Sequence, residues 1–467
     1  MKPIDSGALR ELESRAREAL RAANASGTPR FASLEADAGA FDPFEVVSAS
    51  EETERFFFED PGGGSIAAIG AELTLDGAGP RRLEVLSRRV SALGESGPMS
   101  SAPVPLLVGG FSFAASQSGP LWRGFPQARF VLPSFLFERR GGRSALVWNV
   151  AISPGDDPKA RVQRMVREFD VLERAIAIRS HGVHAAADAP AEFSARADRP
   201  HSVYRLAVRR ALEDLRAGAL EKVVLARSCT LSRPGGFDPV RALAALRTSH
   251  PACYRFARTS GEASFVGATP ERLVRKEGLR VETQALAGSA PRGKTPADDE
   301  RLGAALRESK KEQQEHAIVV RALRAALAAS CESVSAPEAP ALLRLDSIQH
   351  LHTPIEARLL AQSAETVLDL AARLHPSPAI AGFPREAAVS WLRRHEELDR
   401  GWYAGAVGWL RSDGDGELAV ALRTALLRGD EAVLHAGAGI VEGSIPEAEL
   451  AETRIKLRAG LAALVEI

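Results

Sequence analysis

The chain has 467 residues, of which 45% are hydrophobic and 26% charged, as in ordinary folded proteins. Its 60 basic and 60 acidic residues balance, which argues against a protein that binds nucleic acid or another polyanion. The cysteines Cys229, Cys253 and Cys331 are far apart and form neither a metal-type pair nor a disulfide framework. The charged N-terminus predicts a helix rather than a signal peptide, and no apolar run reaches the ~20 residues of a membrane span. We therefore expect a cytoplasmic protein without membrane contact.

The first half of the chain alternates between helical and strand patterns. Helical periodicity covers residues 9–23 and returns over 154–180. Between residues 41 and 150, short apolar runs separated by Gly and Pro predict a largely antiparallel sheet. Residues 185–200 are rich in Ala, Asp and Pro without periodicity, which predicts a linker or a long loop.

Two ionisable residues of the second half lie next to predicted strands. An amphipathic helix with Ser202 as its N-cap is followed by a strand over 221–227, with Lys222 at the entrance of this strand. Lys222 fits either an edge lysine that guards the strand against aggregation or, if desolvated, a general base. A strand–turn–strand pattern over 264–274 places Glu271 just past the turn. Glu271 fits either an exposed turn carboxylate or a general acid.

The next segment predicts a strand, a loop and a long helix. Residues 283–293 predict a strand that runs into a small-residue loop, where a ligand can approach the backbone closely. The helix predicted over 298–329 places Glu308, Glu312 and Glu315 on one face. Three like charges on one face indicate either a solvated surface or a bound cation.

Two later segments carry single polar residues in apolar surroundings. Residues 350–354 predict the end of a strand, on which His350 and His352 share one side but have no third partner for a zinc site. Residues 418–427 predict one apolar strand that contains Arg423. A buried arginine must be paired, so Arg423 is either structural or bound to an anion.

The C-terminal stretch concentrates glycines and charges. A short strand is predicted to end in a tight turn at Gly437 and Gly439, which exposes backbone N–H groups. The helix that follows places Glu449, Glu452 and Lys456 on one face. A plain turn followed by a surface ion pair would explain this pattern. A site for a small, multiply anionic substrate held through a divalent metal would explain it as well.

Seven motifs in order along residues 203–467 resemble those of the chorismate-utilising enzymes, most closely their isochorismate synthase branch. The motifs are EKVVLAR from Glu221, GATPERLV from Gly267, ALAGSAPRG from Ala285, KEQQEH from Lys311, LHPSPAIAGFPR from Leu374, RGWYAGAVGW from Arg400 and AGAGIVEGSIPEAELAETRIKL from Ala436. The resemblance implies an α+β fold in which large antiparallel β-sheets are packed together with helices on the outside. It also implies one structural domain, with residues 1–200 as a divergent N-terminal half and residues 201–467 as the chorismate-binding catalytic region.

The resemblance implies an acid and a base that act on one ring. Lys222 matches the base that activates water at C2 of chorismate, and Glu271 matches the acid that protonates the departing C4 hydroxyl. A lysine acts as a base only when neutral, so the site has to lower its pKa from about 10.4. Glu271 has to stay protonated, so the site has to raise its pKa from about 4.3.

The resemblance also implies Mg²⁺ as the cofactor. Glu315 and Glu452 match the residues that bind the ion, and Glu312 and Glu449 match the carboxylates that surround these ligands. A hard cation of this kind takes oxygen ligands, and it would hold the ring carboxylate of chorismate. The positions that match substrate contacts are Gly288, Ser289, His350, Ile380, Tyr403, Arg423, Gly437, Ala438, Gly439 and Lys456.

Several alternatives remain within and beyond this family. The presence of Lys222 favours water over ammonia as the nucleophile, so no glutaminase subunit is expected, and a monomer or homodimer is expected. Ala287 stands where aminodeoxychorismate synthases have a nucleophilic lysine. A salicylate synthase would keep Lys222 and then eliminate pyruvate, whereas a non-catalytic anion-binding relative would have no need of Lys222 and Glu271. The glycine spacing from Gly437 to Gly443 misses the dinucleotide fingerprint and so disfavours a nucleotide-dependent oxidoreductase. The resemblance leaves open whether the product feeds menaquinone or siderophore biosynthesis.

Overall fold

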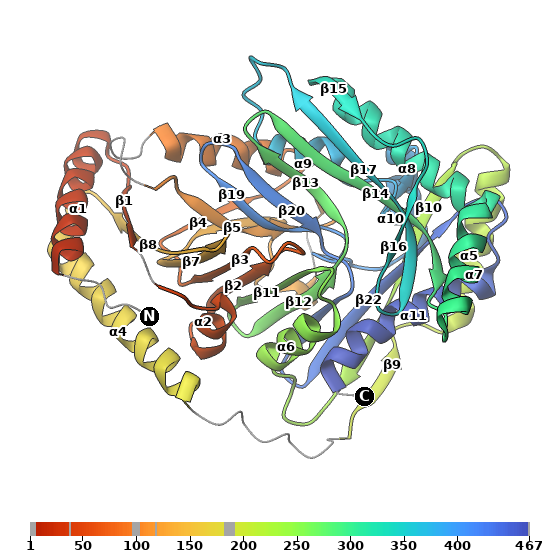
Figure 1. Cartoon of the computed structure of the whole chain (residues 1–467), viewed down its shortest axis with the longest axis horizontal. Coiled ribbons are helices and arrows are strands. Elements are labelled where there is room, and N and C mark those ends of the chain that lie inside the picture. Colours follow the sequence, from red (N-terminus) through yellow and green to blue (C-terminus); the bar gives the residue numbers. More distant parts are fainter. Residues whose placement is uncertain (1–5, 37–38, 96–102, 117–118, 182–191, 466–467) are drawn as a thin grey trace.

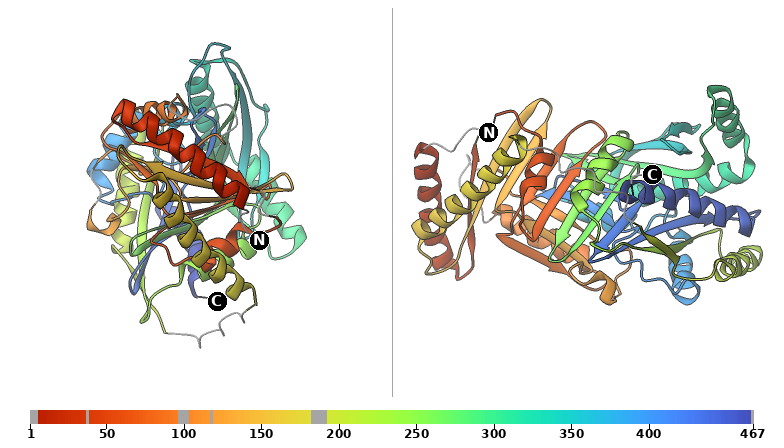
Figure 2. Two further views of the ribbon diagram at one scale, coloured as in Figure 1. Left: turned by 90° about the vertical axis from the view of Figure 1, so that its left-hand side faces the viewer. Right: turned by 90° about the horizontal axis from the view of Figure 1, so that it is seen from below.

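The computed structural model describes residues 6–36, 39–95, 103–116, 119–181 and 192–465. In this part of the chain, two large antiparallel sheets, called sheet A and sheet B, pack against each other and carry helices on their outer faces (Figure 1, Figure 2). Their shared core contains Phe56 and Phe256 from sheet A, and Val274 and Leu410 from sheet B. The predicted α+β fold with packed antiparallel sheets is therefore confirmed.

Sheet A is buried on both faces. Phe56 and Phe58 of β2 (Glu54–Glu59) pack in the core shared with sheet B, whereas Phe57 packs in a second core with Leu12 of α1 (Ser6–Ser26) and Met165 of α4 (Pro158–His181). Because successive side chains of a strand alternate between faces, a strand covered on both sides is apolar throughout. In spatial order, its strands are β1 (Arg30–Ala36), β8 (Arg143–Ile152), β7 (Phe135–Arg140), β3 (Ser65–Ile69), β2 (Glu54–Glu59), β11 (Tyr254–Ser260), β12 (Ala263–Thr269), β21 (Thr424–Arg428), β22 (Glu431–Ile440), β10 (Lys222–Ser232) and β18 (Gly382–Phe383), and β9 (Ser194–Ala197) also pairs with β10.

Sheet B completes the sandwich. In spatial order, its strands are β15 (Cys331–Ser335), β17 (Ile348–Leu359), β14 (Arg280–Pro291), β13 (Arg272–Glu277), β20 (Gly416–Val420), β19 (Ala406–Arg411), β5 (Leu106–Phe111), β6 (Ala128–Leu132) and β4 (Leu73–Gly77), and β16 (Ala341–Arg344) also pairs with β17. Each sheet combines strands from both halves of the chain. In sheet A, Phe58 lies opposite Phe256, and in sheet B, Gly109 lies opposite Gly408.

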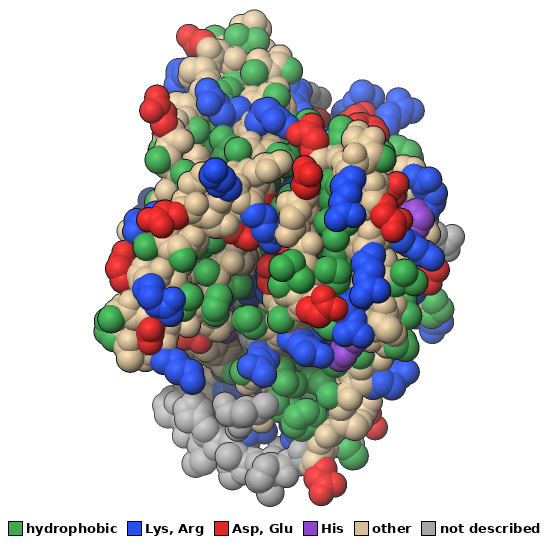
Figure 3. Space-filling model, turned by 90° about the vertical axis from the view of Figure 1, so that its right-hand side faces the viewer, with side chains coloured by type: hydrophobic (Ala, Val, Ile, Leu, Met, Phe, Trp, Pro, Cys, Tyr) green, Lys and Arg blue, Asp and Glu red, His purple; other side chains and the backbone are tan. Residues whose placement is uncertain are grey.

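Helices cover the outer faces and ends of the two sheets. They are α1 (Ser6–Ser26), α2 (Pro43–Ala49), α3 (Arg82–Glu95), α4 (Pro158–His181), α5 (His201–Arg216), α6 (Pro239–Ser249), α7 (Pro296–Glu308), α8 (Lys310–Ala328), α9 (Val367–Leu374), α10 (Arg385–His395) and α11 (Pro446–Val465). Among the described helices, none combines the length and apolarity that crossing a membrane requires. On the face shown in Figure 3, basic and acidic side chains are interspersed, in keeping with their equal totals.

The long helix predicted over residues 298–329 is wrong, because this segment forms two helices. α7 ends and α8 begins at Ser309, whose backbone is extended, with φ −67° and ψ 111°. The Ser309 hydroxyl accepts a hydrogen bond from the Glu312 N–H and so caps α8. Glu308 therefore belongs to α7, whereas Glu312 and Glu315 lie on α8.

The single strand predicted over residues 418–427 is also wrong. β20 ends at Val420 in sheet B, and β21 begins at Thr424 in sheet A. Arg423 lies where the chain crosses between the sheets and has a φ of +52°, which is uncommon for a residue with a side chain. Both strands are buried, so one continuous apolar run conceals the crossing.

The predicted turn at Gly437 and Gly439 is wrong, because β22 continues through both glycines. Gly437 lies opposite Ala226 and Gly439 lies opposite Val224 in an unbroken antiparallel pair. Glycine supplies room here rather than a turn, since a Cβ on Gly439 would lie 2.2 Å from Glu315 Oε1.

Smaller differences concern the ends of elements. β17 begins just before His350 and His352, so these residues lie at the start of the strand and not at its end. Ser202 lies inside α5, whose N-cap is Pro200 and makes no side-chain capping bond. β9 occupies part of the loop predicted over 185–200, and the start of that segment lies outside the described residues. Helices α2 and α3 interrupt the stretch for which only strands were predicted.

Candidate active site

A small cavity between the two sheets collects most of the residues singled out from the sequence. Its volume is about 80 Å³, below the ~300 Å³ at which ligand pockets usually start, so side chains have to move to admit a ligand. The predicted residues that line it are Glu271, Gly288, Ser289, Glu315, His350, Ile380, Tyr403, Arg423, Gly437, Gly439, Glu452 and Lys456. The remaining four residues lie outside this lining. Lys222 lies behind Glu315, with which it forms an ion pair, and Glu312 and Glu449 are both paired with Lys311 beside the cavity. Ala438 points to the opposite face of β22 from Gly437 and Gly439.

Lys222 is fully buried and forms an ion pair with Glu315. The distance from Lys222 Nζ to Glu315 Oε1 is 3.0 Å, and the lysine side chain is 0% exposed. Burial alone would raise the pKa of Glu315, but the ammonium groups of Lys222, Lys311 and Lys456 hold this pKa below its ordinary value. The pair lies against Gly439, where any side chain would collide with Glu315.

Two further lysines neutralise the other carboxylates of α8 and α11. Lys456 Nζ lies 2.7 Å from Glu452 Oε1 and donates to the Gly437 carbonyl at 2.9 Å. Lys311 bridges the helices, with its Nζ 2.9 Å from Glu449 Oε1 and 3.2 Å from Glu312 Oε1.

The carboxylates of α8 and α11 still repel one another. Burial and the neighbouring Glu315 raise the pKa of Glu312, and burial and the neighbouring Glu452 raise that of Glu449. Within the described residues, no three His, Cys, Asp or Glu side chains are grouped closely enough to hold a metal ion as they stand. The donors are nevertheless carboxylate oxygens under mutual repulsion, which is the ligand set that a hard divalent cation takes and the repulsion that it relieves.

Glu271 faces the same cavity and has a strongly shifted pKa. The residue is 5% exposed, and burial raises the pKa of its carboxyl to about 8 against the opposing influence of Lys222, Lys456 and Arg423. The backbone N–H of Glu271 donates a hydrogen bond to the Thr269 hydroxyl at 3.3 Å. A carboxyl in this state carries its proton at neutral pH and can donate it.

A β-bulge shapes the side of the cavity formed by sheet B. The register of β14 against β17 shifts at Gly288, which has a φ of +75° and so adopts a conformation that favours glycine. The bulge lets the Ser289 N–H donate to Glu312 Oε2 at 3.1 Å, and the Ser289 hydroxyl lies 3.0 Å from His350 Nδ1.

Arg423 and His350 form a hydrogen bond on the same side of the cavity, and its direction is defined. Arg423 Nη2 lies 3.0 Å from His350 Nε2, and since a guanidinium can only donate, Nε2 accepts and Nδ1 carries the proton. Burial, with Arg423 and Lys456 nearby, holds the pKa of His350 well below its ordinary value. In the described part of the chain, Arg423 has no carboxylate partner, which leaves its charge available to an anion in the cavity.

Tyr403 and two residues that the sequence interpretation missed form the inner end of the cavity. The Tyr403 ring stacks on His435 at 5.0 Å and 16°. Arg400 forms a buried pair with Glu396 at 2.5 Å and donates to the Ile380 carbonyl at 2.8 Å, which anchors the loop that carries Ile380. Strand alternation could have indicated His435, since it shares a face with Gly437 and Gly439.

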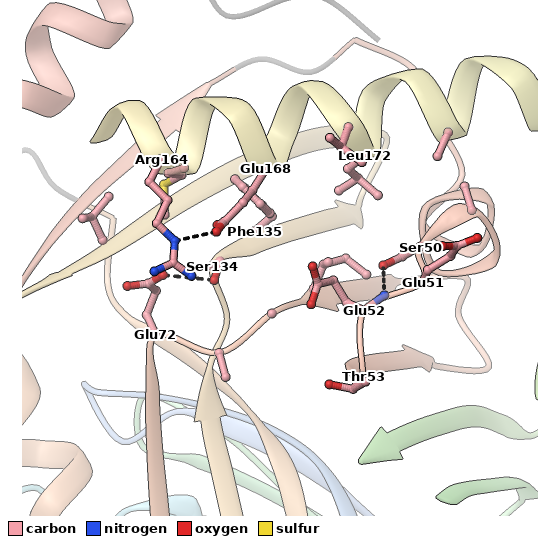
Figure 4. Close-up of a pocket in the computed structure, with 18 of the residues that line it drawn as sticks. Ser50, Glu51, Glu52, Thr53, Glu72, Ser134, Phe135, Arg164, Glu168 and Leu172 are labelled. Atoms are coloured by element: carbon pink, nitrogen blue, oxygen red, sulfur yellow. Dashed lines mark hydrogen bonds and ion pairs between the residues drawn. The ribbon is translucent and has the colours of Figure 1, made fainter. Parts of the chain in front are cut away.

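A larger cavity lies beneath α4, far along sheet A from these groups (Figure 4). Its volume is about 700 Å³. Both of its arginines are paired with carboxylates of the same lining, Arg161 with Glu72 at 3.0 Å and Arg164 with Glu168 at 2.8 Å. The smaller cavity is the better candidate for catalysis, because a buried acid lines it together with an arginine that has no carboxylate partner among the described residues, and a buried lysine lies directly behind it.

Comparison with known proteins assigns the family. Residues 18–465 match the family described as chorismate binding enzyme. The chain belongs to this family. It is 36% identical over 99% of its length to the salicylate biosynthesis isochorismate synthase of Pseudomonas aeruginosa, 96% of which is covered. It is 35% identical over 78% of its length to isochorismate synthase MenF of Bacillus subtilis, 75% of which is covered.

Solved structures of this family share the fold. Menaquinone-specific isochorismate synthase MenF of Escherichia coli superposes with a TM-score of 0.76 at 25% identity, covering 93% of this chain and 94% of that one. The 2,3-dihydroxybenzoate-specific isochorismate synthase DhbC of Bacillus anthracis superposes with a TM-score of 0.72 at 27% identity, covering 90% of this chain and 99% of that one. The family resemblance of the motifs is therefore confirmed.

Proposed function

We propose that the protein is an isochorismate synthase that converts chorismate to isochorismate. The observation that carries this proposal is one cavity lined by a proton-bearing Glu271 and by Arg423, which has no carboxylate partner among the described residues, with the buried Lys222 behind Glu315 in its wall. The relatives named as isochorismate synthases, one of which aligns over 99% of the chain, support the same assignment.

Each proton transfer of the proposed reaction is assigned to one side chain of the protein. Lys222, which has to be neutral to act as a base, takes a proton from water as the water oxygen adds to C2 of the ring. Glu271 gives a proton to the C4 hydroxyl, which leaves as water while the ring double bonds shift. The Lys222 proton then returns to Glu271 through solvent, so one water enters, one leaves and no redox change occurs. Neutral water and a hydroxyl leaving group are both poor reactants, so base and acid each lower the barrier.

The two carboxylates of chorismate are assigned to two ends of the cavity. Arg423 and Tyr403 bind the enolpyruvyl carboxylate. The other proposed contacts are Gly288, Ser289, His350, Ile380, Gly437, Ala438, Gly439 and Lys456. At the opposite end, Glu315 and Glu452 would hold Mg²⁺, with Glu312 and Glu449 beside them, and the bound ion would supply positive charge against the ring carboxylate. For this, Lys222 and Lys456 have to release Glu315 and Glu452, with which they form ion pairs in this structure.

The proposed reaction also leads to expectations about partners, cellular compartment and oligomeric state. Because water is the nucleophile, we expect no glutaminase subunit. We expect the protein to act in the cytoplasm as a monomer or homodimer, on a small-molecule substrate and without nucleic acid.

The test is incubation of the purified protein with chorismate, with and without Mg²⁺, followed by chromatography of the products. Isochorismate alone, formed only with Mg²⁺, is the expected result. Lys222→Ala should abolish it, whereas Lys276→Ala should not, because Lys276 is a similarly buried lysine that pairs with Asp415 outside the site. Salicylate with pyruvate would identify a salicylate synthase, and bound but unchanged chorismate would identify a non-catalytic relative.

A further inference from the structure

His435 is a buried polar residue of the cavity whose ring nitrogens have no hydrogen-bond partner in the described part of the chain. Its side chain is 2% exposed, and neither Nδ1 nor Nε2 has a hydrogen-bond partner among the described residues. It lines the cavity together with Tyr403 and Gly437. An imidazole always carries at least one N–H, and a buried donor left unpaired lowers stability. The partner that the described chain does not supply has to come from the cavity.

The ring of His435 packs against two aromatic rings. Tyr403 stacks on one side at 5.0 Å and 16°, and Trp122 lies at 5.8 Å and 33°. Aromatic neighbours leave only the ring edge, which carries the nitrogens, for polar contacts. On β22, His435 shares a face with Gly437, two residues or about 7 Å further on. At Gly437 a Cβ would lie 3.2 Å from the Tyr403 hydroxyl, so His435 is next to the end of the cavity that this hydroxyl marks.

His435 supplies a directed donor at this end rather than a charge. Burial lowers the pKa of His435 to about 4, and the opposing influence of Asp198 and the added influence of Arg400 do not change this direction. The ring is therefore neutral at physiological pH, with one donor and one acceptor. Arg423 provides the charge for an anion, and His435 adds a second, geometrically restricted contact.

We propose that His435 is a further substrate-binding residue, whose ring N–H donates a hydrogen bond to the enolpyruvyl carboxylate beside Tyr403. The proposal rests on the proposed function, because it assumes chorismate as the occupant. It makes His435 a determinant of affinity for the enolpyruvyl group, whereas Lys222 and Glu271 act on the ring.

His435→Phe tests this role, since phenylalanine keeps a flat ring between Tyr403 and Trp122 and removes both nitrogens. The KM for chorismate should rise about 10-fold, as for the loss of one hydrogen bond to a charged group, while kcat changes less than about 2-fold. The matched control is Trp122→Phe, which alters the other side of the stack without touching the cavity and should leave KM unchanged. An unchanged KM in His435→Phe, with a raised Tm, would show an ordinary buried histidine and overturn the proposal.

A substrate analogue separates this contact from general damage to the cavity. The dihydroxycyclohexadiene carboxylate, which is chorismate without its enolpyruvyl group, should inhibit the wild type and His435→Phe with equal Ki. A Ki that rises as much as KM would overturn the proposal. In the wild type, the ¹⁵N signals of two histidines, the proposed contacts His350 and His435, should shift on addition of chorismate. A shift of only one histidine signal would count against His435, and this measurement serves even where the variant does not fold. Failure of the wild type to form isochorismate would refute the proposed function, whereas normal turnover with an unchanged KM in the variant would refute only the role of His435.

Discussion

At the scale of single residues, Glu271 determines the pH range in which the proposed reaction can run. Its pKa is raised to about 8, so the acid is present at neutral pH and is lost as pH rises through this value. We expect kcat/KM to fall above about pH 8, and Glu271→Gln to lower kcat/KM by about 10²–10⁴-fold below this pH, with a smaller difference above it. A pH–rate profile of both proteins measures this. A wild-type profile that stays flat to pH 10 would show that Glu271 is not the acid.

The same carboxyl makes stability depend on pH in a defined direction. Its folded pKa lies above the ordinary value of 4.5, so the folded protein keeps a proton that the unfolded chain has already lost. The contribution of Glu271 to stability is therefore present below about pH 4.5 and is lost as pH rises through about 8. Denaturation of the wild type and Glu271→Gln should show the variant gaining relative stability over this range.

Residue types and local spacing were accessible from the sequence, but partners across the fold were not. The helical spacing of Glu449, Glu452 and Lys456 predicts one shared face, and the structure has it. The pair of Lys222 with Glu315 joins a strand to a helix far away in sequence, and no local pattern reports such a contact. His435 was missed for a related reason, because a lone histidine in an apolar strand gives no sign that its partner is absent.

At the scale of elements, β22 is specialised for close approach rather than for turning. A glycine-rich run has the same composition in a turn and in a strand that presses against side chains, so the sequence could not separate these cases. The distinction matters at Gly439, because the side chains of Glu315 and Lys222 occupy the space where a Cβ would lie.

Gly439→Ala should therefore displace the Glu315–Lys222 pair. The new Cβ would lie 2.2 Å from Glu315 Oε1 and 3.0 Å from Lys222 Cε, so one or both side chains must move. We expect kcat/KM to fall by about 10²-fold or more, with weaker Mg²⁺ binding in calorimetry. Gly460→Ala on α11 is the control, since its nearest neighbour is the end of the flexible Leu434 side chain. Equal activity of the two variants would contradict this account.

At the scale of the whole molecule, each sheet joins a block of strands from the first half of the chain to a block from the second half. The blocks meet where β2 pairs with β11 in sheet A and where β5 pairs with β19 in sheet B. From this topology we propose that the chain folds as one structural domain, with residues 1–200 as a divergent half of the same sandwich. The sequence alone could not show this, because strand order is set by pairing and not by local pattern.

A fragment of residues 201–467 should consequently fail to fold by itself. It would expose the edge of β11 and the apolar face that Phe56 and Phe58 cover in the intact chain. We expect the fragment to be aggregated or unfolded by circular dichroism, whereas co-expression with residues 1–200 should restore soluble protein. A fragment with a cooperative thermal transition and bound chorismate would show two independent domains.

The crossing at Arg423 has a consequence for the order of events during folding. The residue becomes positioned only after β20 has paired with β13 in sheet B and β21 has paired with β12 in sheet A, and both of these partner strands lie far earlier in the chain. Pairings between such distant segments form slowly, because the loop between them has to close first. Partly folded chains therefore lack the proposed anion receptor, so the protein gains affinity for its substrate only at the end of folding. In a cell that already contains chorismate, the substrate would then stabilise finished molecules without trapping intermediates.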